Sequence, residues 1–400
     1  MLKAMDDWVT AERVKNYSLL LIGAYLITIA WMLLNAKNGL DAFGEPLGND
    51  FLAFYAASDL ARAGQAAAAY DPDTMFLAQQ AALPASRSFY PWLYPPTYQV
   101  LVAPLAYLPH GLALSAWIGV TLGVFLVMVR QISDHRWRLL LALAFPAVLI
   151  NGLNGQNGFL TAGLLGLGLL MLDRRPWVAG LLLGLLAYKP HFGLLLPPLL
   201  MVSGRWRSFV GAAISVLVLI GASLALYGIE PWRAFFTNFD LLSALIENRA
   251  LPQNKAPSVF GATRLLGAET PVAHAIHALF VLPMIVLTLW AWRRAGPLNL
   301  KIALAVPTIL AASPYSYDYD LVMLALPIGI LADYRLRFGA PTGTAAVLLL
   351  AFVTPVAFTA LAGITHLQLM PVAIGLLYLT AWRVLAFAKT RAASQPAGSS

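Results

Sequence analysis

The amino-acid sequence predicts an all-α polytopic membrane protein with about 12 transmembrane helices. Its 400 residues are 60% hydrophobic and only 11% charged, and its mean hydropathy is +0.73. Soluble domains are about 45–50% apolar and about 25% charged, so this composition excludes a soluble enzyme, a disordered chain and a DNA-binding protein. The chain has no cysteine, which excludes disulfides, thiolate metal sites and thiol catalysis.

Apolar runs bounded by charges or by Gly and Pro clusters define the predicted spans in chain order. Several are shorter than the roughly 20 residues of a full crossing, so we expect some to pack inside the protein or to enter the bilayer only partly. The predicted spans are residues 17–37, 111–130, 138–152, 158–172, 177–188, 191–203, 208–227, 275–292, 300–313, 320–333, 343–362 and 368–387.

The distribution of charge predicts the orientation of these spans. If the N-terminus is cytoplasmic and the spans alternate, 18 of the 26 Lys and Arg residues fall in short cytoplasmic segments, and 12 of the 18 acidic residues fall outside. This is the asymmetry that the positive-inside rule requires. We therefore expect a cytoplasmic N-terminus (residues 1–16), a single transmembrane domain (17–388) and a disordered cytoplasmic tail (389–400).

Two outer segments, residues 38–110 and 228–274, are too long to be simple connections. Both mix aromatic and apolar residues with polar ones, so we expect amphipathic helices that lie on the membrane surface. Residues 51–69 are predicted as one such helix. Residues 98–109 are apolar but interrupted by prolines, which predicts an interfacial or re-entrant piece that leads into the second span.

Polar side chains gather in the turns that this topology places on the outer side. Such groups are costly at membrane depth and tend to mark function, so we expect them to line one polar cavity. In chain order they include Asp50, Asn154, Gln156, Asn157, Lys189, His191, Asp318 and Asp320.

Asp50 has two interpretations. A carboxylate held at a helix start, at the boundary between water and lipid, is suited to a general base because partial burial raises its pKa. The same position suits a helix N-cap, a role for which Asn49 and Asp50 are equally well suited.

Lys189 and His191 are also open to several interpretations. A lone cation in an apolar turn suits an anionic ligand such as phosphate, an internal pair with Asp318 or Asp320, or a side chain that snorkels to the interface. His191 is able to bind phosphate or to donate a hydrogen bond, whereas a single histidine is more often a packing residue.

Two acidic pairs have the spacing of ligands for Mg²⁺ or Mn²⁺, namely Asp71 with Asp73 and Asp318 with Asp320. The first pair lies in an ordinary turn. We expect no required cofactor, although a divalent cation is compatible with these residues. The amides of residues 154–157 suit either helix capping or the binding of sugar hydroxyls.

The order of these motifs resembles glycosyltransferase family 87, which belongs to the GT-C superfamily of membrane glycosyltransferases. The similarity runs from about residue 17 to residue 333. The matching motifs are Asn49-Asp50-Phe51 with Tyr55, Tyr70-Asp71, Tyr94-Pro95-Pro96, residues 104–109, Gly155-Gln156-Asn157, Lys189-Pro190, and Ser313-Pro314 through Tyr317-Asp318-Tyr319-Asp320-Leu321.

The resemblance implies a GT-C-like helical bundle and an enzyme of the bacterial plasma membrane whose site faces the exterior or periplasm. Such enzymes transfer a sugar from a polyprenyl-phosphate-linked donor to a lipid or glycan acceptor, and similar members include mannosyltransferases and arabinofuranosyltransferases. Many relatives carry histidine in the last turn, where this chain has Tyr315, Tyr317 and Asp318.

The resemblance also implies roles for individual residues. It makes Asp50 the catalytic base, and the family's Lys-Pro turn matches Lys189-Pro190. Because the charge that develops on a polyprenyl phosphate leaving group needs cations, we expect Lys189, with His191 and an outer-loop arginine (Arg249 or Arg264), to supply them. The residues expected to bind substrate are Lys189, His191, Asn154, Gln156, Asn157, Tyr55, Tyr94, Tyr317, Asp318 and Asp320. Membrane lipids are expected partners, and nucleic acid is not.

A rival class is a transporter or flippase for a lipid-linked or anionic substrate. Its site is expected near the bilayer midplane between internal repeats. The sequence shows no such repeat, and its polar turns gather at one face. A non-catalytic assembly factor is a second rival, and it does not need Asp50 and Lys189 to share a cavity.

Overall fold

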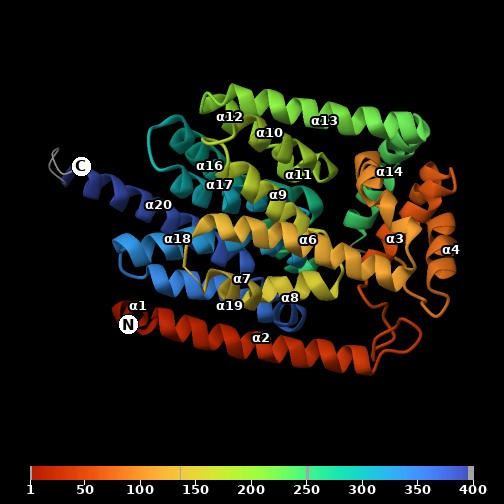
Figure 1. Cartoon of the computed structure of the whole chain (residues 1–400), viewed down its shortest axis with the longest axis horizontal. Helices are drawn as coiled ribbons and strands as arrows, with labels where there is room; N and C mark the ends of the chain where they lie inside the picture. The colour runs from red at the N-terminus through yellow and green to blue at the C-terminus, as the bar shows by residue number, and fades with distance from the viewer. Residues whose placement is uncertain (1, 136, 249–251, 395–400) are drawn as a thin grey trace.

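The computed structural model describes residues 2–135, 137–248 and 252–394, and in these ranges the regular elements are helices, joined by loops that contain two isolated β-bridges. Both termini lie at one end of the molecule (Figure 1). The helices of the first long loop, α3 and α4, lie at the other end with α14 of the second loop (Figure 1). This arrangement is the polytopic all-α bundle that the composition predicts.

Six helices in the described ranges are long and apolar enough to cross a membrane. Each coincides with a predicted span to within a few residues, because a long apolar run between charged turns leaves little freedom in where a helix starts and ends. They are α2 (Ala11–Leu34), α6 (His110–Ile132), α13 (Trp206–Tyr227), α16 (Thr270–Arg293), α19 (Thr344–Thr365) and α20 (Met370–Ser394).

The other six predicted spans are shorter or consist of two pieces. Prolines begin new pieces at Pro146 and Pro190, because proline suits the first turn of a helix and disfavours helical backbone in the residue before it. These elements are α7 (Arg138–Ala144), α8 (Pro146–Leu153), α9 (Gly158–Leu170), α10 (Pro176–Gly184), η3 (Leu185–Tyr188), α11 (Pro190–Gly193), α12 (Leu196–Val202), α17 (Leu298–Ala312), η5 (Asp318–Leu324) and α18 (Ala325–Phe338).

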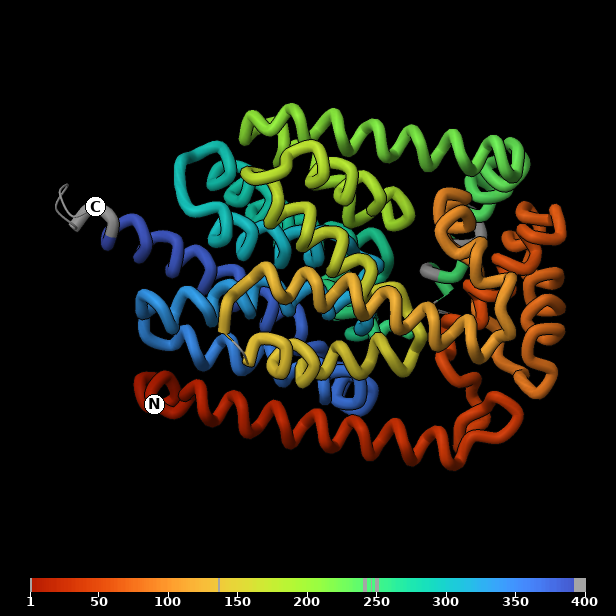
Figure 2. The backbone as a smooth tube through the Cα atoms, in the orientation of Figure 1, coloured from red at the N-terminus to blue at the C-terminus, as the bar shows by residue number. Residues whose placement is uncertain are grey.

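The buried centre of the bundle contains α9 and α17, which are apolar on all sides and almost entirely buried. The first span has the opposite character. Helix α2 runs along the edge of the bundle (Figure 2) and leaves most of its side chains exposed. Its Tyr25 hydroxyl donates a hydrogen bond to the carbonyl oxygen of Ala144 at 3.0 Å, which fastens it to the end of α7.

Short helices build the two long outer segments. The predicted helix over residues 51–69 is wrong as a single element, because Gly64, at φ +74°, ends α3 and a separate 3₁₀ turn follows. The elements are α3 (Phe51–Arg62), η1 (Ala66–Tyr70), α4 (Pro72–Ala82), α5 (Pro96–Val102), η2 (Ala103–Tyr107), α14 (Glu230–Glu247), η4 (Gln253–Lys255) and α15 (Val259–Leu265).

The two chain ends contain more helix than the sequence predicts. A short helix, α1 (Leu2–Trp8), places the Asp6 carboxylate on the backbone N–H groups of Gly343 and Ala345, at 2.6 and 2.8 Å. Asp6 thereby caps the start of α19 from a distant segment. At the other end, residues 389–394, expected to be disordered, continue α20, while residues 395–400 lie outside the described ranges.

Candidate active site

Asp50 stands immediately before α3 at the end opposite the termini. Its backbone is helical (φ −64°, ψ −20°), and its carboxylate makes no capping hydrogen bond to α3. The Oδ2 atom instead accepts a hydrogen bond from Gln156 Nε2 at 3.0 Å. The structure therefore does not support the N-cap interpretation, and Asp50 faces the turn between α8 and α9.

Gly155 allows that turn to come so close. Its φ of +60° is the left-handed conformation that side chains with a Cβ rarely adopt. A Cβ there would also lie 2.7 Å from Phe51 Cβ and 2.9 Å from the Gly48 carbonyl oxygen. The indole N–H of Trp117 donates to the Gly155 carbonyl oxygen at 3.0 Å and fixes the turn. Because Gly155 has no side chain, the turn packs directly against the start of α3, and this close contact places Gln156 beside Asp50.

Gln156 links Asp50 to other predicted residues. Its Oε1 accepts from the Tyr94 hydroxyl at 3.4 Å and from the Asn157 backbone N–H at 3.0 Å. The side-chain amide of Asn157 in turn donates to the Tyr98 hydroxyl at 3.1 Å. The amide cluster is therefore a buried polar network anchored on an aromatic cluster, and Gln156 is oriented from both ends.

Lys189 and Asp320 form a buried ion pair. The Lys189 Nζ and Asp320 Oδ1 atoms are 2.6 Å apart, and only 3% and 2% of the two side chains is exposed. The Tyr319 ring lies under the Lys189 ammonium at 4.8 Å, while Asp320 Oδ2 accepts from the Tyr317 backbone N–H at 3.1 Å. Of the three interpretations of Lys189, the structure supports the internal pair and excludes interfacial snorkelling.

The carboxylate of Asp50 and the ion pair belong to one cluster. Asp50 and Lys189 lie near enough for their charges to interact, and the Tyr94 hydroxyl lies near the charges of both Asp50 and Asp320. The ring of Tyr317 stacks on Tyr319, with 5.9 Å between centroids. Side chains from five separate turns thus meet at one end of the bundle.

Burial raises the pKa of two carboxyl groups of the candidate site, Asp50 and Asp318, which lie outside the membrane-spanning helices. It raises the pKa of Asp50, and the hydrogen bond from Gln156 and the positive charges of Lys255 and Lys189 oppose that rise. Burial likewise raises the pKa of Asp318 to about 6, against the charge of Lys255. Asp50 therefore holds a proton more tightly than an ordinary aspartate does.

Lys255 is the site residue that sequence reasoning missed. It ends η4 in the second outer segment, is partly buried, and its charge acts on both Asp50 and Asp318. Of the two arginines expected in this role, Arg249 lies outside the described residues. Arg264 is buried and donates to the carbonyl oxygens of Ala268 and Glu247, at 2.8 and 3.1 Å, so it holds the loop together.

Three predicted residues lie at the margin of this cluster. The Tyr55 hydroxyl donates to the Leu108 carbonyl oxygen at 3.0 Å and so fastens α3 to the segment before α6. Asn154 Oδ1 accepts from the side chain of Asn49 at 3.4 Å, one residue from Asp50. His191 packs on the ring of Phe192, and its buried Nε2 has no hydrogen-bond partner in the described part of the chain.

One carboxylate of each acidic pair is already engaged by donors of the protein. Both oxygens of Asp320 are engaged, one by the Lys189 ammonium and the other by a backbone N–H, and a second cation beside Lys189 is electrostatically unfavourable. Asp71 caps α4, since its Oδ1 accepts from the backbone N–H and the hydroxyl of Thr74. Within the ranges that the structure describes, no three His, Asp or Glu side chains form a metal-binding group.

Comparison with known proteins gives one finding. The sequence model of glycosyltransferase family 87 matches residues 92–314, which is more than half of the chain. The matched range contains Tyr94, Gln156, Lys189 and Lys255, and it ends shortly before Tyr317. No curated protein and no solved structure matches the chain.

Proposed function

The chain belongs to glycosyltransferase family 87, and from this membership we propose that it is an inverting, polyprenyl-phosphate-sugar-dependent enzyme with Asp50 as its general base. The donor sugar is mannose, another hexose, or a pentose such as arabinofuranose. The acceptor is an envelope glycolipid or glycan at the outer face of the bacterial plasma membrane. The observation that carries the proposal is the Asp50 carboxylate, which is held by Gln156 beside a buried ion pair and caps no helix.

The geometry suits proton abstraction. Gln156 engages Oδ2 of Asp50, and in the described residues no side chain or backbone group donates to Oδ1, which leaves that oxygen for an acceptor hydroxyl. The raised pKa brings the carboxylate closer to the proton affinity that general-base catalysis at neutral pH needs. As the acceptor oxygen attacks the anomeric carbon, its proton passes to Asp50 and the bond from that carbon to the phosphate oxygen breaks. Attack from the face opposite the phosphate inverts the configuration.

The leaving polyprenyl phosphate carries negative charge that the protein must stabilise. Lys189 is already neutralised by Asp320, so we assign it to fixing Tyr317 and Tyr319 in place. Lys255 is the cation whose charge reaches Asp50 and Asp318, and His191 Nε2 is a buried polar atom without a protein partner. We propose that Lys255 and His191 bind the phosphate, because preorganised groups at developing charge are often the largest catalytic term. No divalent cation enters this scheme.

The decisive experiment is a transfer assay with the purified full chain. Radiolabelled polyprenyl-phosphate sugars are supplied with an envelope lipid extract, and labelled product is separated and its anomeric configuration determined. Asp50→Asn should lower the transfer rate about 10²–10⁴-fold, the usual contribution of a general base, with expression and donor binding unchanged.

The matched control is Asp59→Asn, which alters an exposed carboxylate on the same helix; among the residues that the structure describes, it pairs with Arg62 alone. It should leave transfer unchanged. Normal activity in Asp50→Asn would refute the assignment of the base. Transbilayer movement of labelled lipid without any product in the wild-type protein would instead favour a transporter.

A further inference from the structure

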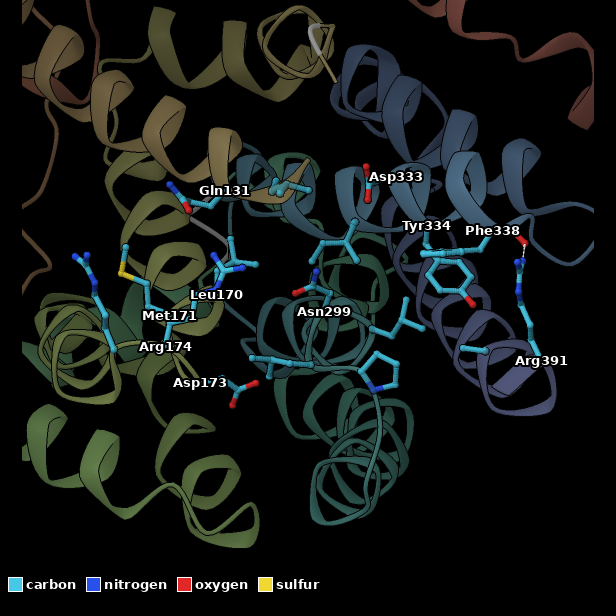
Figure 3. A pocket seen from close by; sticks show the side chains of 17 residues that line it. Gln131, Leu170, Met171, Asp173, Arg174, Asn299, Asp333, Tyr334, Phe338 and Arg391 are labelled. Carbon is cyan, nitrogen blue, oxygen red and sulfur yellow. Dashed lines mark hydrogen bonds between the residues drawn. The ribbon is translucent and has the colours of Figure 1, made fainter. Parts of the chain in front are cut away.

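A cavity lies at the end of the protein opposite Asp50. Its volume is about 830 Å³, within the range of about 300–1,000 Å³ typical of small-molecule sites. Residues at or near the ends of five helices line it. They include Gln131 of α6, Arg174 after α9, Leu298 of α17, Tyr334 of α18 and Arg391 of α20. Figure 3 shows Arg174 and Arg391 on opposite sides of this cavity.

The cavity is separate from the candidate active site. Helix α9 begins beside Asn157 and ends at Leu170 on the cavity wall. Its 13 residues correspond to about 20 Å at 1.5 Å per residue. A headgroup bound in this cavity therefore does not contact Asp50, and the cavity is distinct from the candidate active site.

The acidic groups on the cavity wall are already neutralised from outside it. Asp173 pairs with Arg205 at 2.7 Å. Asp333 accepts from the Ser133 hydroxyl at 2.6 Å and from Arg337 Nε at 3.0 Å. Neither Arg205 nor Arg337 lines the cavity, so the two aspartates do not cancel the positive charge that faces it.

Three arginines provide that positive charge. Arg391 is anchored to the carbonyl oxygen of Phe338, whereas the side chains of Arg174 and Arg175 have no hydrogen-bond or ion-pair partner in the part of the chain that the structure describes. Both of these arginines are exposed and lie side by side in the turn between α9 and α10. An arginine guanidinium binds phosphate oxygens through paired, charge-assisted hydrogen bonds.

The remaining wall is apolar, with Leu170, Met171, Leu298, Ile330 and Phe338. Two of the lining helices, α6 and α20, are long and apolar enough to cross a membrane, and both end at the cavity. We therefore expect the cavity to lie at the depth of the lipid headgroups. Basic pockets between transmembrane helices at this depth bind the headgroups of anionic lipids. We propose that this cavity binds the phosphate headgroup of an anionic membrane lipid in the leaflet opposite the active site, with Arg174 and Arg175 as its phosphate ligands.

A lipid titration of the purified full chain in neutral detergent tests this site. Phosphatidylglycerol, phosphatidylcholine, inorganic phosphate and glycerol 1-phosphate are titrated separately, and the apparent Tm and native mass spectra are recorded. Phosphatidylglycerol should raise the Tm saturably, and the other three should not. In the double variant R174Q/R175Q the apparent Kd for phosphatidylglycerol should rise about 30-fold.

The control is R130Q, which removes an exposed arginine near the end of α6 that does not line the cavity. It should keep the wild-type affinity, and gel filtration should show both variants as folded as the wild type. Equal loss in R130Q, or wild-type affinity in the double variant, would overturn the proposal. A Tm shift that inorganic phosphate alone reproduces would assign the cavity to a soluble phosphate and refute the lipid.

Discussion

The Asp50 carboxylate is governed by few neighbours, so its proton affinity should respond to each of them separately. Gln156 is the only group in the described residues that donates a hydrogen bond to it, and that bond stabilises the charged form. Burial acts in the opposite direction and dominates. The side chain proposed as the base, Asp50, and the side chain that adjusts its pKa, Gln156, are therefore different residues.

The pH dependence of transfer follows from this balance. The proposed base Asp50 has to be deprotonated to accept a proton, and burial raises its pKa. Activity should therefore fall on the acid side at a higher pH than an ordinary aspartate, with a pKa of about 3.9, would cause. Gln156→Leu removes the hydrogen bond to the carboxylate, raises the pKa further, and should move the acid limb of kcat/KM to higher pH.

The matched control for this profile is Asn154→Leu, which alters an amide in the same turn that reaches Asn49 and not Asp50. Its acid limb should stay in the wild-type position. If Gln156→Leu lowers kcat at every pH and leaves the acid limb unmoved, Gln156 does not tune the base.

At the scale of elements, a buried ion pair joins two segments that are far apart in the sequence. The Lys189–Asp320 pair joins the turn between η3 and α11 to the start of η5, and both groups are buried among apolar helices. Removal of one partner of such a pair leaves an uncompensated buried charge, which costs about 3–5 kcal/mol. The pair therefore holds the two turns in register more than it supplies free charge.

A double-mutant cycle at this pair tests that role. Lys189→Met should lower the apparent Tm strongly, by destabilising the fold about 3–5 kcal/mol. Adding Asp320→Asn removes the unpaired charge, keeps an oxygen for the Tyr317 N–H, and should recover most of the loss. Thermal unfolding of the two single variants and the double variant measures the coupling. Additive effects would contradict a structural ion pair.

An element could be predicted when the residues that determine it are neighbours in the sequence. Apolar runs and prolines located the spans and the breaks at Pro146 and Pro190. Helix α1 escaped because its seven residues include two aspartates and form no apolar run, and its capping of α19 joins segments more than 330 residues apart. The predicted single helix over residues 51–69 missed the left-handed Gly64, which ends α3: the N–H groups of Gly64 and Gln65 donate back to the carbonyl oxygens of Ala61 and Leu60. This stop signal is local, and the prediction overlooked it.

The same distinction applies to the candidate site. The apolar runs and the charge asymmetry together placed Asp50, Gln156, Lys189 and Asp320 in turns on one side, and the structure brings them together. The sequence did not show whether Asp318 or Asp320 pairs with Lys189. The two aspartates are only two residues apart, and the choice depends on the directions of their side chains. Lys255 was missed because a single basic residue in a long loop has no periodic pattern that places it.

The whole molecule has two chemically distinct ends. Figure 1 shows the helices of the outer segments at one end and both termini at the other. Asp50 precedes α3 at the first end, and the arginine-lined cavity lies at the second. The positive-inside rule assigns the second end to the cytoplasm. This assignment is open to a direct test, because the chain has no cysteine of its own.

Single-cysteine labelling should establish the orientation. Ala42→Cys lies in the exposed loop before α3, and Ala295→Cys lies in the exposed turn between α16 and α17. In spheroplasts a membrane-impermeant maleimide should label the first and not the second, and both should react in permeabilised cells. Labelling of Ala295→Cys alone would invert the topology and place Asp50 in the cytoplasm.

The buried ion pair also has a consequence for biogenesis. Lys189 and Asp320 are separated by 131 residues, so at about 5–20 residues per second a ribosome needs roughly 7–26 s to reach the aspartate after it has made the lysine. During that interval the nascent chain holds an unmatched ammonium among apolar helices. The ammonium therefore finds its carboxylate only after residue 320 has been made, so the two turns are fixed against each other late in synthesis.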